Sequence, residues 1–345
     1  MKKVLQRILL VVLILGVGIY LAFQLSPYPS VWIIRNAFNK EAIQVNVALK
    51  THVSDAIETI SHIHYDANDP DAFMDAYFHR DTVEIKGKLP VIVWTHGGGL
   101  ISGDKSQVSN YCKILASQGY LVIAIDYTLA PEAQYPTPIR QLNTALAYLS
   151  SHPDQFPADP SFFVLAGDSG GSMISAAAAN VITSPSYAAK TKIQPGLQSH
   201  QLKGLLLYCG IYAIDDLNTE GAFGSFLKSV MWAYFDTKDL SNDPYAQTAS
   251  VTNYLTSAFP PTFISAGNND PLLPQSKLFA EKLSGLSVPT DTLFFPKNHV
   301  PALGHEYQFT LDASGLLALE RSMEFLKVLG KDYRLSSITN VNKEQ

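Results

Sequence analysis

Short apolar runs alternate with longer amphipathic stretches along most of this chain. Each apolar run is bounded by glycine or polar residues, which is typical of strands buried on both faces of a parallel sheet. We expect such strands at residues 90–95, 120–127, 162–166, 202–209, 262–266 and 291–295. The amphipathic stretches predict helices at residues 105–118, 140–150, 172–182, 275–283 and 313–329. This alternation predicts a doubly wound α/β domain, with helices on both faces of a mostly parallel sheet.

Other segments depart from this alternation. Residues 31–80 contain helix-compatible stretches and no strand alternation, so we expect an N-terminal helical cap segment there. The alternation at 82–86 is typical of an edge strand and opens the predicted α/β domain of residues 81–330. Aromatic residues among polar turns at about 211–259 indicate a cap insertion within that domain. Residues 331–345 are expected to form a C-terminal tail.

The first 30 residues differ from the rest of the chain. Residues 8–25 form an uncharged apolar run of 18 residues, which is just long enough to cross the hydrocarbon core of a bilayer as a helix. Basic residues precede this run, so the positive-inside rule places the rest of the chain on the non-cytoplasmic side. A cleaved signal peptide, which would release a secreted protein, is the alternative, but residues 21–24 lack the small residues that cleavage requires. We therefore expect residues 1–30 to be a membrane anchor with a single helix.

The composition excludes two classes of protein. Hydrophobic residues make up 47% of the chain and charged residues only 16%, so the chain can bury a large core and is not disordered. Its net charge of -5 offers no basic surface for a nucleic acid. The two cysteines, Cys112 and Cys209, fall within predicted secondary structure, and we favour two buried thiols over a disulfide bridge.

The strongest chemical signal is Gly-Asp-Ser-Gly-Gly at 167–171. It follows the predicted strand at 162–166 and precedes the predicted helix at 172–182, which is the context of a nucleophile elbow. The glycines permit a tight turn that exposes the hydroxyl of Ser169 above the sheet, beside a helix N-terminus that stabilises negative charge. We therefore predict that Ser169 is a catalytic nucleophile.

A serine nucleophile needs a base that removes its proton and an acid that orients the base. When the serine lies on a nucleophile elbow, the chain order is serine, acid, histidine. Asp270 follows the predicted strand at 262–266, and His305 lies in a loop after the last predicted strand, so both fit this order. His299 is the alternative base. Asp291 is a weaker alternative acid, because it opens a strand at the opposite edge of the sheet.

Negative charge that develops on a substrate oxygen needs backbone N–H donors. Three consecutive glycines follow His96 at the end of a predicted strand, and their backbone can approach a substrate closely. We predict an oxyanion hole made by Gly98, Gly99 and the amide of Gly170, with Gly97 serving the turn. His96 is expected to organise this loop and not to act in catalysis.

Further polar and aromatic residues invite a functional interpretation. His62 and His64 lack additional ligands at metal-binding spacing, so no metal site is expected there. Asp168, beside the nucleophile, is expected to be a structural hydrogen-bond acceptor. The aromatic residues between Phe223 and Phe235 can either line an acyl pocket or pack the cap, and the sequence favours neither.

Together, five motifs resemble those of the hormone-sensitive lipase family of esterases. They are His-Gly-Gly-Gly at 96–99, Asp-Tyr-Thr-Leu-Ala-Pro-Glu at 126–132, Gly-Asp-Ser-Gly-Gly at 167–171, Asp-Pro-Leu at 270–272 and Gly-His at 304–305, within roughly residues 85–330. The resemblance implies the α/β-hydrolase fold, with an eight-stranded sheet and a cap, and hydrolysis of short to medium acyl esters without a cofactor. Thr128 stands where the family usually has Arg, which puts a loop-anchoring contact in doubt, and Gly170 stands where Ala is usual. The anchored layout is also similar to that of arylacetamide deacetylases.

These features predict a serine carboxylesterase that acts on a small-molecule ester through an acyl-enzyme intermediate, with no metal or cofactor. An amidase or deacetylase that uses the same three residues is the alternative. A catalytically silent ligand-binding protein is disfavoured, because Ser169, Asp270 and His305 are all present.

Overall fold

The computed structural model describes the backbone of residues 2–341 and the side chains of residues 2–331. Within these residues, eight strands form one sheet in the order β1-β2-β4-β3-β5-β6-β7-β8. The strands are β1 (Ile57–His64), β2 (Phe73–His79), β3 (Leu89–Thr95), β4 (Leu121–Ile125), β5 (Ala158–Asp168), β6 (Leu202–Tyr208), β7 (Thr262–Ala266) and β8 (Thr290–Phe294). β2 pairs antiparallel with both β1 and β4, and the pairs from β4 to β8 are parallel. The expected mostly parallel sheet is therefore confirmed.

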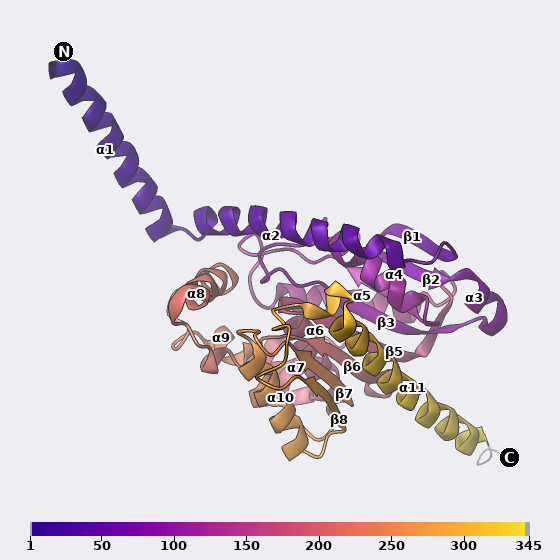
Figure 1. Ribbon diagram of the computed structural model, residues 1–345. Coiled ribbons are helices and arrows are strands. Elements are labelled where there is room, and N and C mark those ends of the chain that lie inside the picture. Colours follow the sequence, from indigo (N-terminus) through magenta and orange to yellow (C-terminus); the bar gives the residue numbers. More distant parts are fainter. Residues whose placement is uncertain (1, 342–345) are drawn as a thin grey trace.

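Helices cover both faces of the sheet (Figure 1). They are α1 (Lys2–Leu25), α2 (Tyr28–Leu49), α3 (Arg80–Lys86), α4 (Ser109–Ala116), α5 (Thr137–Ser151), α6 (Gly170–Thr183), α7 (Pro185–Thr191), α8 (Gly221–Phe235), α9 (Pro244–Ala249), α10 (Leu273–Gly285) and α11 (Ala313–Val341). The insertion expected at 211–259 contains α8 and α9.

Side chains of the central strands alternate between two hydrophobic cores. In β3, Val91 and Val93 belong to the core that also contains residues of α5, α6, α7 and α10. Ile92 and Trp94 belong to the other core, with residues of α4 and α11. This period of two explains why the strands read as continuous apolar runs, since both of their faces are buried.

Two secondary-structure expectations for the N-terminal part are wrong. Residues 82–86 belong to helix α3, and the segment expected to be helical at 31–80 contains β1 and β2 after α2. A register shift between Ile60 and Ile63 breaks the two-residue period of β1, so this half-exposed edge strand has no clear sequence signal. The five alternating residues at 82–86 fit a short surface helix as well as a strand. The sheet edge next to β2 is already occupied by β1.

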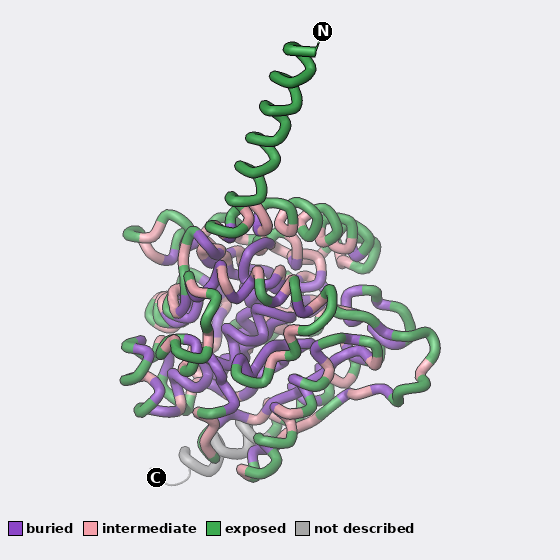
Figure 2. The backbone as a smooth tube through the Cα atoms, turned by 90° about the vertical axis from the view of Figure 1, so that its left-hand side faces the viewer, coloured by how far each residue is buried: buried purple, intermediate pink, exposed green. Residues whose placement is uncertain are grey.

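α1 stands away from the rest of the molecule, and almost all of its residues are exposed (Figure 2). α1 has a mean hydropathy of 2.7 in its most apolar window and no buried residue, so by length and composition it could cross a membrane. The tail expected at 331–345 is helical as far as Val341, because α11 continues to that residue, and residues 342–345 lie outside the described part of the chain.

The central position of β6 generates a stability prediction. Leu206 is fully buried between β5 and β7, so Leu206→Ala leaves a cavity and should lower the free energy of unfolding by about 2–5 kcal/mol. Denaturant unfolding of the full chain in detergent, followed by circular dichroism, measures the change. The control is Val328→Ala on α11, where the side chain is exposed and the change should stay within about 0.5 kcal/mol. Equal effects of the two substitutions would contradict the burial of β6.

Candidate active site

Ser169 lies in a tight turn between a strand and a helix. β5 ends directly before it and α6 begins directly after it. Its backbone has a φ of 49° and a ψ of -118°, which is a strained conformation for a residue with a side chain. A Cβ at Gly171 would collide with the carbonyl oxygen of Thr95, so only glycine lets α6 cross β3 so closely. The structure thus places Ser169 in a sharp strand–turn–helix elbow at the carboxyl ends of the central strands, where the sequence predicts a nucleophile elbow.

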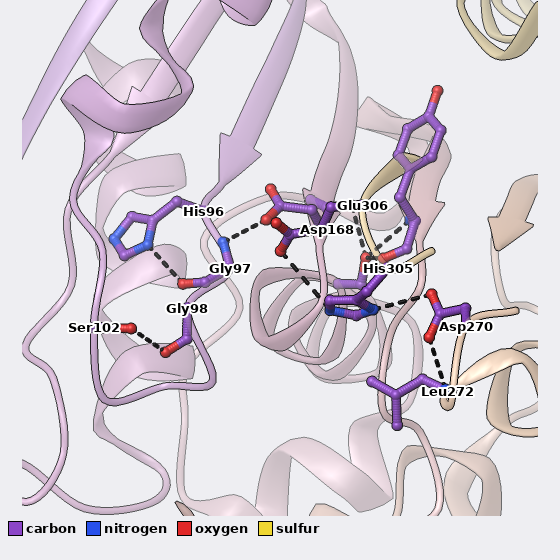
Figure 3. A network of polar contacts seen from close by, with 12 residues as sticks. His96, Gly97, Gly98, Ser102, Asp168, Asp270, Leu272, His305 and Glu306 are labelled. Carbon is purple, nitrogen blue, oxygen red and sulfur yellow. Dashed lines mark hydrogen bonds and ion pairs between the residues drawn. The ribbon is translucent and has the colours of Figure 1, made fainter. Parts of the chain in front are cut away.

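His305 and Asp270 form a hydrogen-bonded pair in the loops that follow β8 and β7 (Figure 3). His305 Nδ1 lies 3.0 Å from Asp270 Oδ2, and the other carboxylate oxygen accepts the backbone N–H of Leu272 at 2.7 Å. The Asp270 side chain is fully buried. A Cβ at Gly267 would collide with the Leu303 carbonyl, so this glycine lets the two loops pack closely. The hydrogen bond between Asp270 and His305 therefore fixes the orientation of the imidazole.

Ser169 and His305 line the same cavity. Among the described residues, no hydrogen bond joins the Ser169 hydroxyl to His305, and Glu306 Oε1 lies 3.8 Å from His305 Nε2 instead (Figure 3). Catalytic hydrogen bonds are often long or unformed until substrate binds. The structure therefore brings the three predicted residues to one site, with a carboxylate beside the nitrogen that would act as base.

The alternative acid and base have other partners. His299 Nε2 lies 3.2 Å from the hydroxyl of Ser314. Asp291 is the second residue of β8, and its carboxylate accepts a hydrogen bond from Arg321 at 2.6 Å. His299 does not line the cavity that contains Ser169, whereas His305 does, and among the described residues the carboxylate that pairs with His305 is that of Asp270, so the geometry favours His305 and Asp270.

The glycine run after β3 has a backbone that residues with side chains rarely adopt. Gly98 and Gly99 have φ values of 90° and 63°, and a Cβ at Gly98 would collide with the carbonyl oxygen of Ser102. A Cβ at Gly170 would come within 3.1 Å of Leu100, so the alanine that is usual in related esterases would crowd this leucine. Gly98, Gly99 and Gly170 all line the cavity, and we call them the oxyanion glycines.

His96 packs within this loop. Its buried Nδ1–H donates to the Gly97 carbonyl at 2.9 Å, and its ring stacks on Tyr127 at 4.4 Å between centroids. Burial lowers the pKa of His96, which keeps the ring neutral. The Tyr127 hydroxyl also donates to the carbonyls of His96 and Gly97. These contacts fit the predicted role of His96 in organising the loop.

Asp168 connects the elbow to the glycine loop. Its carboxylate accepts hydrogen bonds from Trp94 Nε1 and from the Gly97 N–H, both at 2.8 Å. A Cβ at Gly97 would collide with this carboxylate, so Gly97 is needed for the close approach and not only for the turn. Burial and the neighbouring carboxyl of Glu306 raise the pKa of Asp168 well above its usual range. The sequence analysis did not single out Glu306, and its only signal was adjacency to His305.

The surroundings of His305 favour its protonated form. Burial alone would lower its pKa, but the hydrogen bond to Asp270 and the Glu306 carboxylate raise it above the usual value of 6.5. The side chain is 30% exposed, so the ring still reaches the cavity.

Cys209, Asp270 and His305 place potential metal-ligand atoms within 4.8 Å of one another. Burial raises the pKa of the Cys209 thiol to about 11, so the group stays protonated near neutral pH, whereas a metal binds the thiolate. The cluster is therefore poorly suited to a metal. Cys209 and Cys112 are both buried and unpaired, as expected.

A cavity of about 650 Å³ lies above the candidate catalytic residues and is walled by α2 and α8. Phe223 and Phe226 of α8 line it. Tyr234 and Phe235, at the end of the same helix, instead pack against Tyr135, with ring centroids 5.8 and 5.5 Å apart. Each interpretation of the aromatic segment thus holds for part of it: one end faces the cavity and the other packs the cap.

An arginine on α2 anchors the loops around the oxyanion glycines. Arg35 donates to the carbonyls of Ile101 and Ala130 at 2.6 and 2.9 Å, and it pairs with Glu132 at 2.7 Å. Glu132 ends the motif in which threonine replaces the usual arginine, and Thr128 itself donates to the carboxylate of Asp71 at 2.8 Å. The replacement of arginine by Thr128 puts a loop-anchoring contact in doubt, but here Arg35 and Thr128 together anchor these loops.

The BD-FAE family model matches residues 74–283, which is more than half of the chain. The chain belongs to the BD-FAE family.

Solved structures of esterases share the fold. Esterase B from Lactobacillus rhamnosis is 21% identical, with a TM-score of 0.73 over 88% of this chain and 97% of that chain. An esterase from Pyrobaculum calidifontis is 21% identical, with a TM-score of 0.70 over 88% and 95%. A bacterial heroin esterase is 20% identical, with a TM-score of 0.61 over 86% and 89%. These likenesses confirm the α/β-hydrolase fold.

The charges around the His305 imidazole generate a prediction for titration. Because the folded protein favours the imidazolium, the pKa of His305 measured by NMR should lie above 6.5. Glu306→Gln removes a neighbouring negative charge and should lower that pKa. The control is Glu324→Gln on α11, an exposed position remote from the site, which should leave it unchanged. A pKa for His305 that Glu306→Gln does not change would show that this carboxylate does not act on the imidazole.

The contacts of Arg35 predict a local loss of order. Arg35→Ala removes the donors to two loop carbonyls, which should destabilise these loops by about 1–3 kcal/mol. Hydrogen-deuterium exchange should then increase at residues 98–102 and 128–132. Lys40→Ala, an exposed position on the same helix, is the control and should not alter exchange there. Unchanged exchange in the Arg35 variant would mean that α2 does not anchor the loops.

Proposed function

We propose that this protein is a serine carboxylesterase that hydrolyses short to medium acyl esters through an acyl-enzyme intermediate. The observation that carries the proposal is the convergence of Ser169, the His305–Asp270 pair and the oxyanion glycines on one cavity. The esterases that share the fold support it.

In the proposed reaction, Ser169 Oγ attacks the ester carbonyl carbon while His305 Nε2 accepts the hydroxyl proton. Asp270 holds the opposite ring nitrogen through the 3.0 Å hydrogen bond and stabilises the imidazolium. The backbone N–H groups of the oxyanion glycines stabilise the negative oxygen of the tetrahedral intermediate. His305 then returns the proton to the leaving alcohol, and water cleaves the acyl-enzyme by the same steps. This chemistry requires no metal or cofactor.

The hydrogen bond between Ser169 and His305 has to form when substrate binds. Glu306 now lies 3.8 Å from His305 Nε2, and its backbone has a φ of 57°, so its side chain is held near the ring by an unusual turn. We expect the carboxylate to move away from Nε2 as the substrate enters, which frees this nitrogen to face Ser169.

The cavity is suited to an apolar acyl group. Its volume of about 650 Å³ lies within the range of small-molecule sites. A Cβ at Gly99 would lie 3.1 Å from Phe226 Cζ, so this ring lies directly over the oxyanion loop. Leu227 and Val230 continue the apolar wall along α8. An acyl chain attached to Ser169 would therefore pack against α8.

The location proposed for the enzyme follows from α1. This helix is long and apolar enough to cross a membrane. The basic residues before its apolar run favour a cytoplasmic N-terminus and a catalytic domain on the non-cytoplasmic side. Secretion after cleavage of the segment is the alternative.

The test is hydrolysis of p-nitrophenyl esters of increasing acyl length by the full chain in detergent. We expect rates that peak at short acyl chains and fall by at least about 10³-fold in Ser169→Ala and in His305→Ala. His299→Ala is the matched control for the base and should retain activity, since this ring lies outside the cavity.

A parallel p-nitroanilide series separates the alternative activities. Faster serine-dependent cleavage of anilides than of esters would replace the esterase by an amidase. A folded protein that cleaves neither series would indicate a ligand-binding protein, and activity retained in Ser169→Ala would refute the nucleophile.

A further inference from the structure

Helix α2 packs one side on the protein and exposes large apolar residues near each of its ends. Val31 and Leu49 are buried against the body of the protein, and Arg35 and Asn46 hydrogen-bond to neighbouring loops. The exposed apolar residues form two groups, which we together call the outer face of α2, and the exposed polar Asn36 and Lys40 lie between the groups. They are Tyr28, Trp32 and Ile33 near the start of the helix and Ile43 and Val47 near its end, and each is at least half exposed. Exposed large apolar residues that gather on one element mark a surface that contacts a partner or a membrane.

The outer face of α2 is continuous with the helix that could cross a membrane. α1 ends at Leu25 and α2 begins at Tyr28, with the buried Pro27 between them. α1 stands away from the body of the protein, whereas α2 turns and runs along its surface (Figures 1 and 2). A bilayer crossed by α1 would therefore meet the protein along α2. Tyr28 and Trp32, the aromatic residues that prefer the membrane interface, lie nearest this bend.

The segment that follows the cap helix α8 contacts the C-terminal end of α1. Lys238, just after α8, donates to the Gln24 carbonyl at 2.7 Å. Its ammonium also lies 3.9 Å from the ring centroid of Trp232. Lysine and tryptophan are both common at the level of lipid headgroups. Helices α2 and α8 form two walls of the cavity, and α2 and the segment that follows α8 therefore both contact the C-terminal end of α1 or its flanking residues.

The cavity opens along α2. Phe38, Glu41 and Ala48 line the cavity and are also exposed, so the opening follows this helix. Phe38 meets Phe226 of α8 with ring centroids 5.3 Å apart, which gives the opening an aromatic edge. A molecule dissolved in the outer part of a bilayer beside α2 would reach this edge over a short distance.

We propose that the outer face of α2 lies on a lipid bilayer and that the cavity receives ester substrates which partition into that bilayer. This inference rests on the proposed esterase function for the identity of the substrate, but the seat of α2 on the membrane can be tested without any reaction. The bilayer is favoured over a second copy of the chain because α1 leads directly into this face.

The first test measures the depth of α2 with spin labels in the full chain reconstituted into phosphatidylcholine vesicles. The native cysteines are buried, so labels attach to the introduced cysteines of Ile33→Cys and Val47→Cys. We expect collisions with lipid-soluble oxygen to be several-fold more frequent, relative to a water-soluble nickel complex, than at Val328→Cys. Val328 is a matched control, because it is a similarly exposed valine on α11, a helix that runs away from α1 (Figure 1).

Two results would overturn the membrane seat. Equal collision ratios at the three positions would place α2 in water. Spin-spin broadening at Ile33→Cys that disappears on dilution with unlabelled protein would show that a second copy covers this face.

The second test separates the membrane route from the catalytic function. In the double variant Trp32→Gln and Ile33→Gln, the KM for a butyrate ester of a long-chain alcohol, presented in vesicles, should rise at least about fivefold, because the apolar contact with the bilayer is lost. Hydrolysis of soluble p-nitrophenyl acetate should stay within about twofold, since neither residue lines the cavity. Unchanged KM for the vesicle substrate would refute the membrane route. Failure of the esterase function itself would appear separately, as no Ser169-dependent hydrolysis of the soluble ester.

Discussion

The close crossing of β3, β5 and α6 is the constraint on which the rest of the site depends. Gly171 touches the Thr95 carbonyl, and any side chain there would push α6 away from the sheet. This packing forces Ser169 into its left-handed backbone conformation at the start of the helix. The glycine loop after β3 lies directly beside the turn, so one packing contact sets the positions of both Ser169 and the oxyanion glycines.

Buried polar groups then fix the positions around this crossing. The Asp168 side chain accepts hydrogen bonds from the Trp94 Nε1–H and the Gly97 N–H, and these two bonds tie the elbow to the glycine loop. A buried carboxylate is costly unless its oxygens are paired, and here the surroundings raise its pKa. Glu306 adds a second carboxyl near both Asp168 and His305, and its charge raises the pKa of each of these two groups.

The cap combines segments that are far apart in the sequence. α2 supplies Arg35 to the loops around the oxyanion glycines and Phe38 to the opening of the cavity, while α8 supplies Phe226 over the oxyanion loop. The same α2 follows directly on the apolar α1. A single helix thus links the N-terminal segment, the entrance and the catalytic loops, so the position of the entrance relative to a membrane follows from how α2 packs.

The sequence by itself determined the central strands, the order of helices and the residues of the candidate triad, because strands buried on both faces and glycines in obligatory turns leave local signals. It did not reveal the hairpin of β1 and β2 or the helix α3, since half-exposed edge elements have weak periodicity. The carboxyl of Glu306 beside the imidazole and the anchoring by Arg35 were decided by the tertiary structure. These contacts join residues on separate loops and helices, and the distance between such residues depends on how the elements pack and not on any local pattern.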